Sequence, residues 1–282
     1  MYFCCMQFVK KVFDFYLNSS IHVALAAVCL SWLTLIEYQI PCDMYVLNFI
    51  FFATIMGYNF VKFFGLAQFH HRSLSSWLKF IQIFSMISFL IMGYFATQLQ
   101  LKTVFYLMVF AVVTFLYAIP FLPKKFYLDK QQNLRNISGL KVHVIALVWS
   151  GVTVLVPLIN NDRFVDTTVI WAFIQRFVLV LALMLPFEIR DMQFDSIKLA
   201  TIPQRIGIKN TKIMGVVLVL LFFGLEFFMP EKPMNKLLIQ LAITLILIMS
   251  ILLARKNQGK YYSGFWVESI PILWLLLTLL FG

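Results

Sequence analysis

The chain between residues 235 and 254 reads NKLLIQLAITLILIMSILLA, in which Lys236 is the single charged residue. A transmembrane helix needs about 20 largely apolar residues, because the hydrocarbon core of a bilayer is about 30 Å thick. This stretch has that length and that composition. It therefore predicts a membrane-spanning helix.

Comparable stretches recur along the whole chain, which is 62% apolar and 12% charged. Soluble domains have roughly 45–50% apolar and about 25% charged residues, so lipid must cover much of this surface. Nine spans are expected, near residues 21–38, 44–66, 76–97, 102–121, 141–160, 168–186, 213–229, 235–254 and 263–281. The prediction is an all-α polytopic membrane protein, with a bundle of nine transmembrane helices in a single domain over residues 1–282.

The segment before the first span has a different pattern. Residues 6–18 place Lys10 and Lys11 among phenylalanine and valine residues. This alternation is typical of an amphipathic helix that lies at the membrane surface. An N-terminal amphipathic helix is therefore expected beside the nine spans.

The basic residues predict the orientation of the chain, whose formal charge is +11. With the N-terminus in the cytoplasm, 18 of the 23 Lys and Arg residues fall on the inner side and 4 on the outer side, while Arg176 lies within a span. Short cytoplasmic connections carry such an excess. The C-terminus is then outside, the lipid bilayer explains the basic charge, and no nucleic-acid partner is expected.

The most polar inner segment, residues 187–198, contains Asp191 and Asp195. Residues four apart share one helix face, so the two carboxylates could hold one Mg²⁺, which commonly binds one or two carboxylates together with substrate phosphates. The alternative is a solvated charged face in which Arg190 and Lys198 neutralise both aspartates.

The residues that follow, Thr201-Ile202-Pro203-Gln204-Arg205-Ile206-Gly207, extend the pattern. Together with Asp191 and Asp195, this segment resembles the second aspartate motif of the UbiA-type intramembrane prenyltransferases. In that family a D-x-x-x-D pair precedes T-L-P-x-x-x-G on the cytoplasmic side after the sixth of nine helices. The resemblance assigns Asp191 and Asp195 as catalytic, metal-binding residues.

A second segment is similar to the family's connection between helices four and five. Residues 134–141 contain Arg135 and Lys141 and run into a helix with Ala146 and Trp149 in an A-x-x-W spacing. The resemblance implies that Arg135 and Lys141, with Arg190, bind the diphosphate of a polyprenyl substrate. Ordinary positive-inside flanking is the alternative for these basic residues.

The first aspartate motif of the family, which reads roughly N-D-x-x-D-x-x-x-D, is not preserved. Asn59 matches, but Phe60, Phe63 and Ala67 stand where the family has aspartates, and Lys62 lies among them. The resemblance therefore implies one Mg²⁺ site at most. Lys62 is expected to pair with a carboxylate of the second motif, to face the cavity mouth with Asn59 and bind diphosphate, or to extend to lipid headgroups.

Three further ionisable side chains fall inside expected spans. Arg176 and Glu226 are expected on neighbouring antiparallel spans, where they could form a pair. Glu268 lies towards the inner end of the last span. An intramembrane ionisable residue is a functional candidate, although Glu268 could also simply reach the inner surface.

The resemblance implies a divergent UbiA-like protein that binds a polyprenyl diphosphate in a cytoplasm-facing cavity and transfers the prenyl group to an acceptor in the lipid phase. The alternative is a non-catalytic relative that binds an isoprenoid or another lipid, or supports a partner protein. A transporter fits less well, because the spans show no repeat of broken, Gly/Pro-interrupted helices. The long D-G-x-x-A-R signature of CDP-alcohol phosphotransferases is absent from the sequence.

Overall fold

The computed structural model describes residues 2–69, 76–118, 140–193, 201–229 and 233–282, and every regular element in these ranges is a helix. The α-helices are α1 (Tyr2–Asn18), α2 (Ile21–Glu37), α3 (Met44–Phe69), α4 (Ser76–Ala96), α5 (Leu101–Ala118), α6 (Leu140–Ser150), α7 (Val156–Asn160), α8 (Thr167–Asp191), α9 (Ile202–Gly224), α10 (Met234–Leu253) and α11 (Ile270–Phe281). Two π-helical turns (Gly151–Leu155 and Tyr262–Val267) and a 3-10 turn (Leu225–Phe228) complete the set. The all-α prediction is confirmed.

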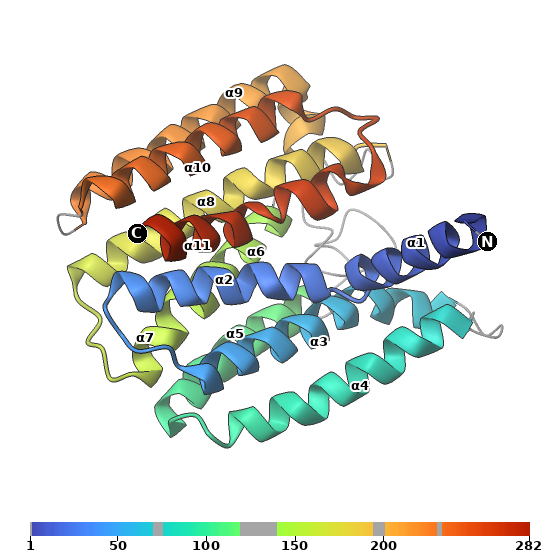
Figure 1. Ribbon diagram of the computed structural model, residues 1–282, viewed down its shortest axis with the longest axis horizontal. Helices are drawn as coiled ribbons and strands as arrows, with labels where there is room; N and C mark the ends of the chain where they lie inside the picture. The colour runs from blue at the N-terminus through green and yellow to red at the C-terminus, as the bar shows by residue number, and fades with distance from the viewer. Residues whose placement is uncertain (1, 70–75, 119–139, 194–200, 230–232) are drawn as a thin grey trace, which may run out of the picture.

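The helices form one bundle with their axes roughly along a common direction (Figure 1). Helix α8 packs against α6 and α9, and α10 packs against α9 and α11. Helix α2 lies between α11 and α3, and α3 also packs against α4. The N-terminus and the C-terminus lie at opposite ends of the bundle in this view. The ends of α3 and α8 and the turn Tyr262–Val267 before α11 lie toward the same end of the bundle as α1 (Figure 1), and the start of α6 contacts the end of α8 there.

The helix lengths make this a multi-pass membrane protein. Seven helices are long and apolar enough to cross a bilayer, and an eighth span results if α1 and α2, which meet at a bend of 56°, are taken as one. Within the described residues, which stop at 118 here, α5 is apolar over Leu101–Leu116, and this described part alone is shorter than a typical span. The predicted count of nine is therefore not confirmed, although the chain is plainly polytopic.

The side chains separate into a packed interior and an apolar outer surface. Leu30, Phe222 and Ile243 are fully buried in the main core between α2, α9 and α10. Phe80 and Leu90 on α4 leave about two thirds of their surface exposed, at 66% and 65%. Such apolar exposure would be costly in water, whereas in a bilayer these side chains contact lipid.

Two turns of π-helix interrupt the bundle where it surrounds a cavity. One runs from Gly151 to Leu155, and a Cβ on Gly151 would lie 2.0 Å from the ring of Phe110, so glycine is needed for this close contact. The other, Tyr262–Val267, leads directly into Glu268. A π-helical turn carries an extra residue, which changes the side chains that the following helix presents to its neighbours, and such turns are frequent at functional sites.

Candidate functional site

A cluster of charged side chains lies where α8 ends. Arg190 donates from Nε to Asp191 Oδ1 at 2.9 Å, and its Nη2 lies 2.8 Å from the same oxygen. Lys141, at the start of α6, places its ammonium 3.7 Å from the other Asp191 oxygen. The structure thus brings together Lys141, Arg190 and Asp191, three of the residues that the sequence pointed to.

Glu188 belongs to the same cluster, and the sequence-based assignment missed it. Its side chain is only 2% exposed. Its Oε1 atom forms an ion pair with Lys141 Nζ, 2.9 Å away. A buried carboxylate is stable only when it is paired, so Lys141 compensates for the burial of Glu188 as well as facing Asp191. The one-turn spacing from Glu188 to Asp191 puts both on the face of α8 that meets α6.

The second π-helical turn is joined to this cluster through Arg190. The guanidinium donates from Nη1 to Ser263 Oγ at 2.9 Å and lies 5.3 Å from the centre of the Phe187 ring. A planar guanidinium can make such contacts in several directions at once, which a lysine cannot. Arg190 therefore fixes the end of α8 against the start of the last span.

A separate polar network surrounds Asn59 on α3. Asn59 donates to the Ser19 carbonyl at 3.1 Å and to Ser85 Oγ at 2.8 Å, and it accepts from Ser20 Oγ at 2.8 Å. Lys62 donates from Nζ to Ser20 Oγ at 2.8 Å. Among the residues that the structure describes, the ammonium of Lys62 contacts this hydroxyl and no carboxylate, so Lys62 and Asn59 are joined through Ser20.

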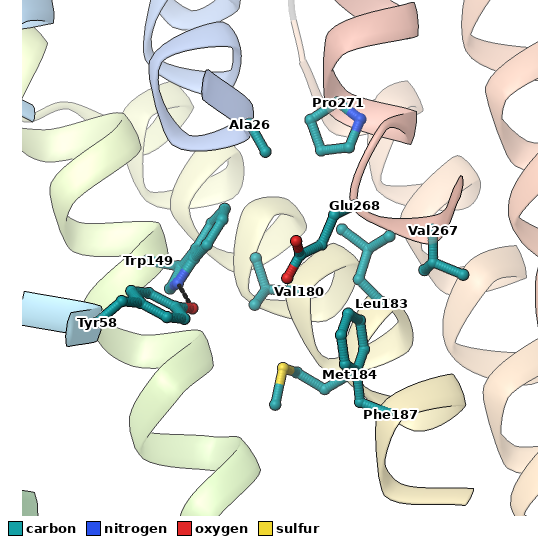
Figure 2. Close-up of a pocket in the computed structure, with 10 residues that line it drawn as sticks. All are labelled: Ala26, Tyr58, Trp149, Val180, Leu183, Met184, Phe187, Val267, Glu268 and Pro271. Carbon is teal, nitrogen blue, oxygen red and sulfur yellow. Dashed lines mark hydrogen bonds between the residues drawn. The ribbon is translucent and has the colours of Figure 1, made fainter. Parts of the chain in front are cut away.

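A cavity of about 40 Å³ is walled by residues of α2, α3, α6, α8 and α11 and of the turn before α11. Its lining residues are Ala26, Tyr58, Trp149, Val180, Leu183, Met184, Phe187, Val267, Glu268 and Pro271. Trp149 donates from its indole nitrogen to the Tyr58 hydroxyl at 2.9 Å, and the Glu268 carboxylate faces the same space (Figure 2). The cavity is apolar apart from these groups.

The start of α9 shows how the segment after the aspartates is shaped. The Thr201 amide donates to Gln204 Oε1 at 2.9 Å, and Pro203 occupies the first turn, where its missing amide costs nothing. Gly207 has φ 78° and ψ 159°, which breaks the helix and which side chains other than glycine rarely tolerate. The threonine, proline and glycine of the motif therefore each have a local structural role.

Two of the expected site residues, Arg135 and Asp195, lie outside the described residues. The described residues form no group of three or more metal-ligating side chains. Asp191 has one oxygen bound by Arg190 and the other near Lys141. Asp191 does not by itself fit a Mg²⁺ ion, because the metal would have to displace both Arg190 and Lys141 from a single carboxylate.

Solved structures share this helical arrangement. A UbiA homologue from Aeropyrum pernix K1, in its apo form, is 12% identical with a TM-score of 0.64, and the match covers 92% of this chain and 98% of that one. The chain has the UbiA fold. A UbiA homologue from Archaeoglobus fulgidus, bound to GPP and Mg²⁺, is 14% identical with a TM-score of 0.57 and coverage of 94% and 98%.

A digeranylgeranylglyceryl phosphate synthase has the same fold, at 15% identity and a TM-score of 0.57 over 96% of this chain and 98% of that one. No protein-family model and no curated protein sequence matches the chain. The UbiA likeness is thus carried by the arrangement of the helices along nearly the whole chain. It agrees with the resemblance of the two short sequence segments.

Proposed function

We propose that this protein is a divergent UbiA-like membrane protein that binds a polyprenyl diphosphate at the end of the bundle where α3, α6 and α8 meet. The observation that carries the proposal is that Lys62, Lys141 and Arg190 lie on α3, α6 and α8, the helices that supply Tyr58, Trp149 and Phe187 to the wall of the apolar cavity. A diphosphate needs cationic donors, and a prenyl chain needs an apolar wall. The Archaeoglobus fulgidus neighbour is bound to GPP.

Lys62 is the cation best able to receive a phosphate. Its side chain is exposed, and its hydrogen-bond partner among the described residues is the neutral Ser20 hydroxyl. Lys141 and Arg190, in contrast, are already engaged by Glu188 and Asp191. We assign Lys62 and Asn59 to one side of the diphosphate and Arg190, Lys141 and Arg135 to the other, the last from the sequence resemblance.

Transfer of the prenyl group to an acceptor in the lipid phase is the activity that the UbiA fold favours. Asp191 and Asp195 remain the proposed catalytic pair, with one Mg²⁺ at most, and the diphosphate would leave towards the cations around it. A non-catalytic isoprenoid-binding protein is the second candidate. It is favoured by the two cations that hold Asp191 and by the replacement of the first-motif aspartates.

The site is proposed to face the cytoplasm, with the N-terminus inside and the C-terminus outside. The support is the uneven distribution of Lys and Arg between the two sets of connections. Labelling of a cysteine introduced at Lys209 from outside intact cells would contradict this orientation.

Geranyl diphosphate binding tests the proposal. We expect the purified protein in lipid nanodiscs to bind it, and Lys62→Ala to weaken binding about tenfold or more, since a charged hydrogen bond contributes about 1.5–3 kcal/mol. Lys102→Ala, at the other end of the bundle, is the matched control and should bind as the wild type does. Titrations with Mg²⁺ and with EDTA separate a metal-assisted site from a purely cationic one.

The proposal fails if the wild type does not bind geranyl diphosphate under either condition. It also fails in its present form if Lys62→Ala binds as tightly as Lys102→Ala. Release of diphosphate from the bound ligand in the presence of lipid extract would favour the transferase over the non-catalytic candidate.

A further inference from the structure

Basic side chains are in excess at the end of the bundle that holds α1. Three segments lie at this end, namely α1, the connection of residues 254–261 and residues 202–213 of α9 (Figure 1). Their sequences contain one acidic residue, Asp14, and eight basic residues, which are Lys10, Lys11, Arg205, Lys209, Lys212, Arg255, Lys256 and Lys260. These eight side chains are called the basic rim below. Lys212 is half-buried, and the other seven are exposed.

Contacts between the segments fix the basic rim in place. Asp14 of α1 accepts from Lys260 Nζ at 2.6 Å and from the Tyr261 hydroxyl at 2.9 Å. Lys212 of α9 donates to the Leu252 carbonyl at 2.6 Å, at the end of α10 from which the connection starts. The acidic residue of the set therefore holds α1 against the connection, and the rim is an assembled surface.

The positive charge of the rim is not balanced by the protein itself. At the other end of the bundle, Lys102 forms an ion pair with Asp162, and Arg163 lies 3.4 Å from Asp166. Within the described residues, one of the eight rim side chains has such a pair, which is the contact of Lys260 with α1. A surface with one sign of charge attracts ions of the opposite sign. The rim therefore favours an anionic partner.

Apolar side chains lie among the basic ones, and they indicate what kind of anion the rim meets. On α1, Val9 and Val12 flank the two lysines and are 60% and 53% exposed. On α9, Ile206 and Ile213 are exposed beside the basic residues of that helix. Water or a nucleic acid would not favour aliphatic side chains between the cations. At a membrane boundary, aliphatic side chains contact the acyl chains while neighbouring Lys and Arg side chains reach the headgroups.

We propose that the basic rim binds the headgroups of anionic phospholipids. The exposed lysines and arginines would contact the negatively charged headgroups, and the valines of α1 would contact the upper part of the acyl chains. Clusters of about four to eight basic residues beside a transmembrane helix or on an amphipathic helix are typical of such binding. The proposal does not depend on the diphosphate site, because it needs no substrate.

Native mass spectrometry of the full-length protein in detergent tests the proposal. Dioleoylphosphatidylglycerol and dioleoylphosphatidylcholine, which share their acyl chains and differ in net charge, are titrated into the same sample. The wild type should bind the first phosphatidylglycerol about tenfold or more tightly than the first phosphatidylcholine, since each basic residue near the headgroups contributes roughly fivefold. This preference should shrink as the concentration of ammonium acetate rises, because salt screens the attraction.

A triple variant locates the preference on the rim. Lys10→Gln, Lys11→Gln and Lys256→Gln together remove three exposed charges and leave the contacts of Asp14 and Lys212 intact. This variant should reduce the preference for phosphatidylglycerol by about fivefold or more. The same three positions changed to arginine keep the charge and should keep the wild-type preference.

The matched control removes three basic residues at the other end of the bundle, by Lys102→Gln, Arg163→Gln and Lys236→Gln. Its net charge equals that of the glutamine variant of the rim, and it should bind both lipids as the wild type does. Thermal melting followed by circular dichroism shows that the variants are folded.

The proposal is overturned if the wild type binds the two lipids equally. It is overturned as well if the glutamine variant of the rim keeps the wild-type preference, which would leave an acidic soluble partner as the occupant of the rim. An equal loss of preference in the matched control would also overturn it, because net charge rather than the rim would then decide.

Discussion

The ion pair between Lys141 and Glu188 should be essential for stability, and Lys141→Met tests this directly. The change leaves the Glu188 carboxylate, 2% exposed, without the ammonium that lies 2.9 Å away. Breaking a buried pair by removing one partner typically costs about 3–5 kcal/mol. Because the Lys141 side chain is 18% exposed and water can approach that end, we expect about 3 kcal/mol.

A double-mutant cycle separates this pair from general effects on packing. Glu188→Leu combined with Lys141→Met leaves no unpaired charge, so the double variant should be about 2 kcal/mol more stable than Lys141→Met alone. The matched control is Lys102→Met, which breaks an ion pair with Asp162 whose side chains are 46% and 72% exposed. Exposed pairs contribute about 0–1 kcal/mol, so this control should change little.

Reversible unfolding in mixed micelles of dodecyl maltoside and sodium dodecyl sulfate, followed by circular dichroism, gives the free energies. The reasoning is refuted if Lys141→Met costs no more than Lys102→Met. It is also refuted if the two changes at Lys141 and Glu188 are simply additive, because the pair would then contribute nothing that either residue does not contribute alone.

Two further changes have defined outcomes. Gly207→Ala should lower the free energy of unfolding by about 1–3 kcal/mol, because φ 78° with ψ 159° suits glycine alone, whereas Gly224→Ala, where a Cβ would meet nothing within 4 Å, should be neutral or stabilising in the same assay. Hydrogen bonds from the Thr168 hydroxyl and the Val169 amide hold the pKa of Asp166, which caps α8, below its usual value. Its stabilising effect should therefore be present above about pH 4 and disappear as the pH falls through the lowered pKa. Asp166→Asn should keep the cap and lose that pH dependence, and an unchanged pH profile would contradict the assignment.

The helical fold could be predicted because its physical cause is local in the sequence. Whether 20 consecutive residues can cross a bilayer depends on those residues alone, as in Met234–Leu253. The exact count of spans depends on more than length. Whether α1 and α2 count as one span depends on the bend of 56° between them, which hydropathy does not display.

The site was predicted in part for the same reason. Asp191, Arg190 and Lys141 carry a motif that can be recognised, but the partner that Lys141 holds most closely is Glu188, a residue outside the motif. Arg176 donates to the Leu30 carbonyl at 2.8 Å, and Glu226 accepts from the neighbouring Gln175. Successive residues on a helix point about 100° apart. Which side chains meet between two helices therefore depends on how each helix is rotated about its own axis, and hydropathy does not determine that rotation.

The segment around Asn59, where the resemblance to UbiA-type proteins would place aspartates, connects several helices to one another. Phe60, at one of these positions, stacks on Phe115 of α5, with ring centres 6.4 Å apart. Asn59 meanwhile ties α3 to Ser85 of α4 and to the link between α1 and α2.

Among the described side chains of this segment, Phe60 takes part in aromatic packing, Asn59 takes part in a hydrogen-bond network, and Lys62 brings a positive charge. The charge balance is then consistent without a second cation. In the proposed function, Lys62 on α3 and Arg190 on α8 would bind the diphosphate from two sides.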